Sequence, residues 1–289
     1  MSKPIARFAP LSRVHWGSFL IIVVACLYVG VIILLPALAV VVQAFAKGVG
    51  VFLENFQSPE LLSALGMTLM ATAIAVPLNT IFGLAAATAI ARRQFRGKAL
   101  LLSVIDLPFS ISPVVVGLML VLLYSPSNGL LGGVITSLGW KIIFSWPGIV
   151  LATIIVTFPF MAREVIPLLE EEGWDQEEAA RTLGASNWQV FWKVTLPSVR
   201  WAALYGLILT TARALGEFGA VAVVSGNIVG QTQTLPLFVE DAYKQYHTEL
   251  AFGAAMVLGG VALVSLLLKA LVERLLEHER HSSRQIQEE

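Results

Sequence analysis

The sequence has few of the side chains that build catalytic or metal centres. It contains one cysteine and four histidines among 289 residues. The single cysteine, Cys26, can neither close a disulfide within the chain nor form a thiolate metal cluster. There is no HExxH motif, and no histidine lies in an apolar run where it could serve an intramembrane serine as base; the four are His15, His247, His278 and His281. We therefore expect no catalytic residue and no metal site, which argues against an intramembrane hydrolase.

Charge is also scarce. Charged residues make up 13% of the chain and sum to a net charge of zero, so no overall positive field favours nucleic acid as a partner. The chain has no GxxxxGK[ST] phosphate loop, so it cannot bind and hydrolyse ATP by the usual route. In contrast, 57% of the residues are hydrophobic and the mean hydropathy is +0.79. This composition indicates a protein that is surrounded by membrane lipid.

Long apolar runs predict an all-α integral membrane protein. A membrane-crossing helix needs about 20 mostly apolar residues. The first run is longer than the apolar part of a typical secretion signal, so we interpret it as a retained helix. We predict a single transmembrane domain over residues 1–289 with six transmembrane helices, near residues 18–45, 63–91, 99–123, 147–167, 202–225 and 250–270.

Lysine and arginine positions predict the orientation of these helices, because cytoplasmic loops are enriched in both. One set of connections and termini holds most of them: Lys3, Arg7, Arg13, Arg92, Arg93, Arg96, Lys98, Arg163, Arg181, Lys193, Arg200, Lys269, Arg274, Arg280 and Arg284. The opposite set, residues 46–62, 124–146 and 226–249, holds only Lys47, Lys141 and Lys244. The pattern predicts a multi-pass protein with both termini in the cytoplasm.

The cytoplasmic loop 170–200 contains a stretch of unusual composition, EEAARTLGASNWQVFWKVTLP at residues 177–197. Asp175 and Glu178 have the spacing of a helix N-cap and its box partner, and Gly184 is a natural helix stop. Ser186 and Gln189 form a second capping box before an aromatic helical run that ends at Pro197. Two helices this short are not stable alone in water, so they must pack against something. Periodicity alone leaves open whether this is a partner protein or the membrane interface of the chain itself.

The same stretch resembles the EAA loop of membrane subunits of ATP-binding-cassette importers. The match covers the spacing Glu-Ala-Ala, three residues, Gly-Ala, five residues, Phe, four residues, Leu-Pro. In this chain the matching residues are Glu178, Ala179, Ala180, Gly184, Ala185, Phe191, Leu196 and Pro197. The resemblance implies that these residues couple the chain to separate ATPase subunits.

The wider chain resembles most closely the W-type permease subunits of bacterial sulfate/thiosulfate importers. The segments that carry this resemblance are VQAFAKG (42–48), DLPFSISPVVVGL (106–118), FSWPGIVLATIIVTFPF (144–160), ARALGEFGAVAVVSG (212–226) and TLPL (234–237). The resemblance implies a bacterial inner-membrane location and three kinds of partner: a homologous T-type permease, an ATPase dimer, and an extracytoplasmic sulfate- or thiosulfate-binding protein. ATP and Mg²⁺ would be bound by the ATPase subunits, and no cofactor by this chain.

Two charges fall within the fifth predicted span. Arg213 lies near mid-bilayer if it is counted from Trp201 at about 1.5 Å per residue, and a charge there costs at least about 2.5 kcal/mol. One interpretation is that Arg213 and Glu217, at i and i+4, neutralise each other and hold helices in register. The other is that Arg213 offsets the charge of a passing dianion while Glu217 controls its availability. Both hold if the pair is part of a gate.

The third predicted span is interrupted by Pro108 and Pro113. Broken backbone inside a membrane is tolerated where it is buried in protein or lines a cavity. Ser110 and Ser112 are therefore candidate pathway residues, with a simple packing kink as the alternative. Asp106 would repel an anion, so we assign it a structural role.

Some alternatives stay open on the sequence alone. Molybdate or another tetrahedral oxyanion could replace sulfate or thiosulfate as the solute, and a homodimer could replace the heterodimer. A secondary transporter is a further class, but six spans with a coupling loop fit it poorly, because such proteins usually show repeated halves and a complete pathway in one chain.

Overall fold

A computed structural model describes the backbone of residues 16–288, and within this range it contains helices and no strands. Side chains are described for residues 19–272 and for Arg274. The helices are α1 (Trp16–Ala44), α2 (Val49–Asn55), α3 (Pro59–Arg92), α4 (Lys98–Ser110), α5 (Pro113–Tyr124), α6 (Gly132–Ser137), α7 (Trp146–Glu172), α8 (Asp175–Thr182), α9 (Asn187–Val190), the π-helical η1 (Phe191–Thr195), α10 (Leu196–Ser198), α11 (Arg200–Leu215), α12 (Gly219–Val224), α13 (Leu235–Lys244) and α14 (Thr248–Glu288).

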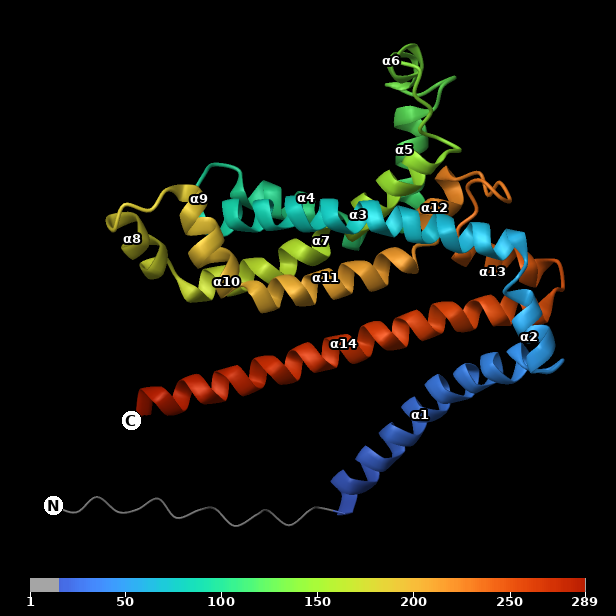
Figure 1. The fold of residues 1–289 in the computed structure, drawn as a ribbon, viewed down its shortest axis with the longest axis horizontal. Helices are drawn as coiled ribbons and strands as arrows, with labels where there is room; N and C mark the ends of the chain where they lie inside the picture. The colour runs from blue at the N-terminus through green and yellow to red at the C-terminus, as the bar shows by residue number, and fades with distance from the viewer. Residues whose placement is uncertain (1–15, 289) are drawn as a thin grey trace.

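The centre of the molecule is a bundle of α3, α7 and α11, which run side by side (Figure 1). The contact between α3 and α7 is the most extensive in the described chain, because small residues let the backbones approach closely. At Gly83 of α3, an added Cβ would lie 2.7 Å from Cβ of Met161 on α7. A buried hydrogen bond also joins the two helices, from Asn79 Nδ2 to Thr157 Oγ1 at 2.7 Å.

Four helices of the described chain are long and apolar enough to cross a membrane: Phe19–Ala44, Pro59–Arg92, Trp146–Glu172 and Thr248–Val272. They match four of the six predicted spans. The remaining two predicted spans are both broken into helix pairs. The prediction of a helical membrane protein is therefore confirmed, and the count of six spans stays a prediction.

The third predicted span, residues 99–123, consists of α4 and α5, which meet at an angle of 111°. The break falls at Ile111 and Ser112, directly before Pro113. Pro113 is the first residue of α5, where its missing N–H costs no helix bond, whereas Pro108 is accommodated inside α4. As a result α5 and α6 project away from the bundle (Figure 1).

The fifth predicted span, residues 202–225, consists of α11 and α12. The helix stops at Gly216 and resumes at Gly219, so that α11 has 16 residues. This is shorter than the roughly 20 residues of an unbroken membrane span. The two broken predicted spans are thus the two that contain the candidate pathway residues.

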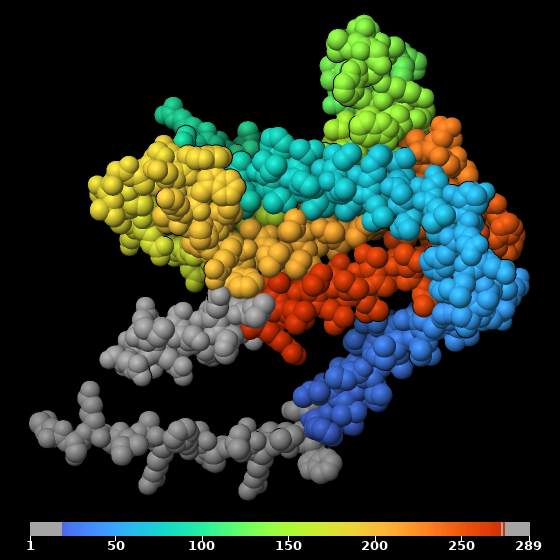
Figure 2. Space-filling model, in the orientation of Figure 1, coloured from blue at the N-terminus to red at the C-terminus, as the bar shows by residue number. Residues whose placement is uncertain are grey.

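The first helix lies apart from most of the bundle and contacts α14 (Figures 1 and 2). Apolar side chains such as Ile21, Leu27 and Ile33 are exposed along its length. An exposed apolar surface of this size needs lipid or another protein to cover it.

The two ends of the molecule differ in composition. The end of α3, the turn into α4, the α8–α10 segment and the end of α14 lie at one end of the bundle (Figure 1). Arg92, Arg93, Arg96 and Lys98 are at this end, and α2 and α13 are at the other. Arg163 was predicted among the loop charges but lies within α7. The predicted N-terminal charges Lys3, Arg7 and Arg13 lie outside the described residues.

Candidate functional sites: the 175–197 loop and the broken helices

Two positive-φ glycines bound the first helix of the 175–197 loop. Gly173 ends α7 with φ 69°, and Gly184 follows α8 with φ 89°. L-residues with a side chain rarely adopt this conformation, whereas glycine adopts it without strain. The predicted stop at Gly184 is therefore confirmed.

Only the second of the two predicted capping boxes forms. Ser186 N–H donates to Gln189 Oε1 at 2.8 Å, and Gln189 N–H donates to Ser186 Oγ at 3.3 Å. The predicted N-cap at Asp175 is wrong, because Trp174 occupies that position and Asp175 is the first residue of α8. Asp175 nevertheless stabilises the first turn, where a negative charge interacts favourably with the helix dipole.

The second half of the loop is less regular than predicted. After the four residues of α9 the chain forms the π-helical segment η1, and Leu196 and Pro197 then begin α10. An aromatic cluster stabilises this segment. The ring centroids of Phe191 and Trp192 are 5.6 Å apart, as are those of Trp188 and Trp192. Phe191 is half-buried, while Trp192 is exposed.

The residues that match the EAA pattern lie at the surface of the loop. Glu178, Ala179 and Gly184 are exposed, and Ala180 and Ala185 are partly exposed. The large apolar side chains beside them are unusually exposed, Leu183 at 89% and Trp188 at 70%. A polar and apolar surface of this kind is typical of an interaction site.

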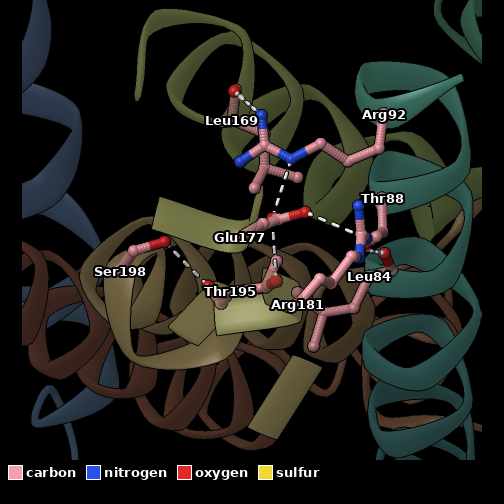
Figure 3. A network of polar contacts seen from close by, with 8 residues as sticks. All are labelled: Leu84, Thr88, Arg92, Leu169, Glu177, Arg181, Thr195 and Ser198. Carbon is pink, nitrogen blue, oxygen red and sulfur yellow. Dashed lines mark hydrogen bonds and ion pairs between the residues drawn. The ribbon is translucent and has the colours of Figure 1, made fainter. Parts of the chain in front are cut away.

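The opposite side of α8 carries a buried network that the sequence analysis missed (Figure 3). Glu177 Oε1 accepts hydrogen bonds from Arg92 Nε at 2.9 Å and from Thr195 Oγ1 at 2.8 Å. The side chains of Arg92 and Glu177 are only 8% and 5% exposed. Arg92 also donates through Nη1 to the carbonyl oxygen of Leu169 at 2.6 Å. Arg181 Nη2 approaches Glu177 Oε2 at 3.6 Å, and 42% of the Arg181 side chain is exposed. These five residues are called the Glu177 network below.

The sequence contained only part of the signal for this network, because the loop does not identify the partner of Glu177. Glu177 and Glu178 are neighbours on a short helix, and adjacent side chains point about 100° apart. Glu177 can therefore be buried while Glu178 faces outward, as the structure shows. A buried carboxylate requires a cation, and the basic end of α3 supplies one.

The predicted pair Arg213 and Glu217 does form an ion pair, with 2.6 Å between Arg213 Nη1 and Glu217 Oε2. Glu217 is buried, with 1% of its side chain exposed, while Arg213 is 32% exposed. The second carboxylate oxygen, Glu217 Oε1, accepts a hydrogen bond from the N–H of Ala220 at 3.0 Å. Glu217 thus joins the last turn of α11 to the first turn of α12. Arg213 retains an accessible face.

The two helix breaks lie against each other. An added Cβ at Gly219 would come 3.1 Å from Cβ of Pro113. One turn further on, an added Cβ at Gly117 of α5 would meet the carbonyl oxygen of Ala220 at 2.8 Å. The α4–α5 break and the α11–α12 break therefore form one irregular region of the bundle. Paired breaks of this kind are typical of solute sites in transporters.

Ser110 and Ser112, the predicted pathway residues of the α4–α5 break, are both exposed. Ser112 is the N-cap residue of α5, and its side chain makes no capping hydrogen bond there. Asp106 pairs with Arg163 of α7 at 2.7 Å, in line with its predicted structural role. Among the described residues, no group of three or more His, Cys, Asp or Glu side chains could hold a metal ion.

Comparison with known proteins identifies relatives over most of the chain. A model of the family described as "Binding-protein-dependent transport system inner membrane component" matches residues 79–278. The chain is 65% identical over 250 residues to the sulfate transport system permease protein CysW of Synechococcus elongatus, with 86% of this chain and 87% of the relative covered. It is 36% identical over 254 residues to the sulfate transport system permease protein CysT of Escherichia coli K12, with 88% and 91% covered.

A solved structure has the same fold at low sequence identity. It is a bacterial alginate ABC transporter in complex with a periplasmic protein bound to an alginate pentasaccharide. One of its chains superposes with a TM-score of 0.74 at 17% identity, which covers 90% of this chain and 93% of that one. The described helices thus adopt the same fold as that chain.

Proposed function

This chain belongs to the family of binding-protein-dependent transport system inner membrane components, and from that premise we propose that it is the W-type permease subunit of an ATP-driven sulfate importer. It is a multi-pass membrane protein that transports and does not itself hydrolyse ATP. The relative from Synechococcus elongatus, at 65% identity, supports sulfate as the solute. Thiosulfate is a second proposed solute, since it has the same charge and a similar tetrahedral shape.

The observation that carries the proposal is the exposed face of the 175–197 loop. Glu178 and Ala179 lie on the short helix α8 at the basic end of the bundle, Gly184 follows it, and the apolar side chains of Leu183 and Trp188 lie nearby in the loop. An isolated helix as short as α8 is not stable in water, so it needs a protein surface against which to pack. We assign this surface to an ATPase subunit that binds ATP and Mg²⁺ in the cytoplasm.

The other proposed partners complete the importer in the inner membrane. A homologous T-type permease pairs with this chain, in keeping with its 36% identity to a CysT protein. The exposed apolar residues of α1, α4 and α5 offer surface for that partner and for membrane lipid. An extracytoplasmic binding protein delivers the anion at the opposite end of the bundle from the 175–197 loop.

The solute pathway is proposed to run past the joined helix breaks. Arg213 has an accessible guanidinium but is held by Glu217 at 2.6 Å, so its positive charge is largely neutralised. A fully available cation in a low-dielectric path would bind sulfate too tightly to release it. The pair and the free hydroxyls of Ser110 and Ser112 instead bind the anion only weakly along the pathway. A conformational change driven by the ATPase opens and closes this pathway.

Purification of the tagged chain from its native membrane tests this proposal. We expect an ATPase and a second permease to co-purify, and sulfate-loaded binding protein to stimulate ATP hydrolysis in proteoliposomes. Thiosulfate-loaded and molybdate-loaded binding proteins, assayed in parallel, identify which oxyanion is carried. Recovery of a lone chain that transports without ATP would refute the proposal and indicate a secondary transporter. Recovery of two copies of this chain with no second permease would replace the heterodimer by a homodimer.

A further inference from the structure

We propose that the buried ion pair between Glu177 and Arg92 is the contact through which movement of the 175–197 loop reaches the helix bundle. In this role Glu177 is a positioning residue that does not touch solute or nucleotide. The inference rests on the proposed function, because it assumes an ATPase that moves the loop. It assigns to Glu177 a task separate from that of its neighbour Glu178, which faces outward.

The loop has few other attachments to the bundle. The segments α8, α9 and η1 pack on one another, and none of them packs extensively against α3. Glu177 is the only buried residue of α8, all of which the structure describes. The positive-φ glycines Gly173 and Gly184 flank the helix, so the backbone itself constrains it little.

A groove separates the rest of the loop from α3. Its volume is about 770 Å³, and its walls come from the second half of α3 on one side and from loop aromatic residues such as Trp188 and Trp192 on the other. Arg92, Glu177 and Thr195 also line this groove. The Glu177 network therefore bridges a gap that the surrounding apolar side chains leave open.

The geometry of the network suits the transfer of displacement. The Glu177 carboxylate is tied to Arg92 of α3 and to Thr195 of η1, at 2.9 and 2.8 Å. Arg92 is the last residue of α3, and its 2.6 Å hydrogen bond to Leu169 O adds α7. Charge-assisted hydrogen bonds have fixed lengths and directions, whereas apolar surfaces can slide. A shift of α8 thus moves the ends of α3 and α7 together.

The bundle can carry this movement further. Beyond the network, α3 and α7 remain joined by the close contact at Gly83 and by the buried Asn79–Thr157 hydrogen bond. α7 also packs against α5 and α12, the helices that follow the two breaks. A continuous series of packed elements therefore connects the exposed face of α8 with the proposed pathway.

The test compares variants of neighbouring residues in the complete transporter. Glu177→Gln and Arg92→Gln each remove one charge of the pair while a polar side chain remains. Arg93→Gln is the matched control, because Arg93 is adjacent in sequence, exposed and outside the network. Thr195→Val removes one neutral donor and leaves the ion pair intact. Each variant is purified with its partners, and both co-purification of the ATPase and sulfate uptake per ATP hydrolysed are measured in proteoliposomes.

We expect Glu177→Gln and Arg92→Gln to retain the ATPase but to lower uptake per ATP by at least about fivefold, the lower end of typical coupling effects. Thr195→Val should lower uptake per ATP by a smaller factor, and Arg93→Gln should leave uptake per ATP unchanged. The variant with both Glu177→Gln and Arg92→Gln should be no worse than either single change, because the two residues act as one unit.

Two results would overturn the inference. Uptake per ATP within about twofold of the wild type in Glu177→Gln and Arg92→Gln would remove the coupling role. Loss of the ATPase in parallel with loss of uptake would instead show that Glu177 only shapes the docking surface. A wild-type complex without an ATPase or without sulfate-stimulated hydrolysis would be a different failure. It would refute the proposed function, and this inference with it, before any variant is examined.

Discussion

Arg213 and Glu217 form an ion pair of 2.6 Å across the point where α11 ends, and the two side chains differ strongly in exposure. Glu217 is buried and also accepts the N–H of Ala220, so it holds the break together. Arg213 keeps a solvent-accessible face. The structural role and the pathway role thus fall mainly on different members of the pair, and they can be tested separately.

Removal of Arg213 alone should destabilise the protein more than removal of both charges. Arg213→Gln leaves the carboxylate of Glu217 buried without a cation, which typically costs about 3 kcal/mol. The double variant Arg213→Gln/Glu217→Gln retains an acceptor for Ala220 and should recover most of that loss. Thermal unfolding of the detergent-solubilised complex measures both. A double variant as unstable as the single one would contradict this explanation.

The same two variants separate the structural from the solute-related role of Arg213. If Arg213 contributes to the anion pathway, the double variant should regain stability without regaining sulfate uptake. Full recovery of uptake together with stability would indicate that the pair only holds the helices in register.

The outward face of α8 should control ATPase binding. Glu178→Lys reverses the charge of an exposed residue at the proposed docking surface. Gly184→Pro is incompatible with φ 89°, because proline fixes φ near −65°. Both variants should insert into the membrane normally but lose the co-purifying ATPase and sulfate uptake. Glu54→Lys, a charge reversal at an exposed position of α2 at the opposite end, is the control and should retain both. Normal uptake in Glu178→Lys and Gly184→Pro would contradict the assignment of the loop.

Local signals in the sequence predicted much of this architecture. The long apolar runs that became α1, α3, α7 and α14 needed no tertiary information, because length and hydropathy alone define a membrane helix. The stop at Gly184 and the capping box of Ser186 with Gln189 were equally local. The i, i+4 spacing of Arg213 and Glu217 indicated an ion pair as one of two interpretations, and the structure shows that pair.

Features that depend on distant contacts were missed. Glu177 acquires its role only from Arg92, 85 positions earlier, and no pattern within the loop identifies that partner. Asp175 and Glu178 have capping-box spacing, but Trp174 occupies the N-cap and Glu178 faces outward. The interruption near Pro113 was predicted from its prolines, whereas the break at Gly216 was read as a continuous span because apolar composition persists across it. Their mutual contact through Pro113 and Gly219 is a tertiary feature.

The junction between α1 and α14 should weaken in acid. Lys47 Nζ lies 2.9 Å from Glu249 Oε1, and this hydrogen bond is the main cause that lowers the pKa of Glu249 below its ordinary value of 4.5. Because the folded pKa is the lower one, the stabilisation is present above pH 4.5 and is lost as the pH falls through the folded pKa. Amide hydrogen exchange at residues 45–48 should be slower in the wild type than in Glu249→Gln at neutral pH. At equal pH below the folded pKa the two proteins should match, and a difference that persists there would contradict the role of the ion pair.

The close contact between α3 and α7 predicts opposite effects for two glycines on the same helix. At Gly83 an added Cβ would lie 2.7 Å from Cβ of Met161, so Gly83→Ala forces the helices apart and should cost about 1–3 kcal/mol. At Gly66 an added Cβ meets nothing within 4 Å, so Gly66→Ala should instead stabilise α3 by about 0.5–1 kcal/mol. Both changes add one methyl group to a helical glycine, so intrinsic helix propensity is matched and only the packing differs. Thermal unfolding of the two variants checks the prediction. Equal shifts of the same sign would show that α3 and α7 are not in close contact at Gly83.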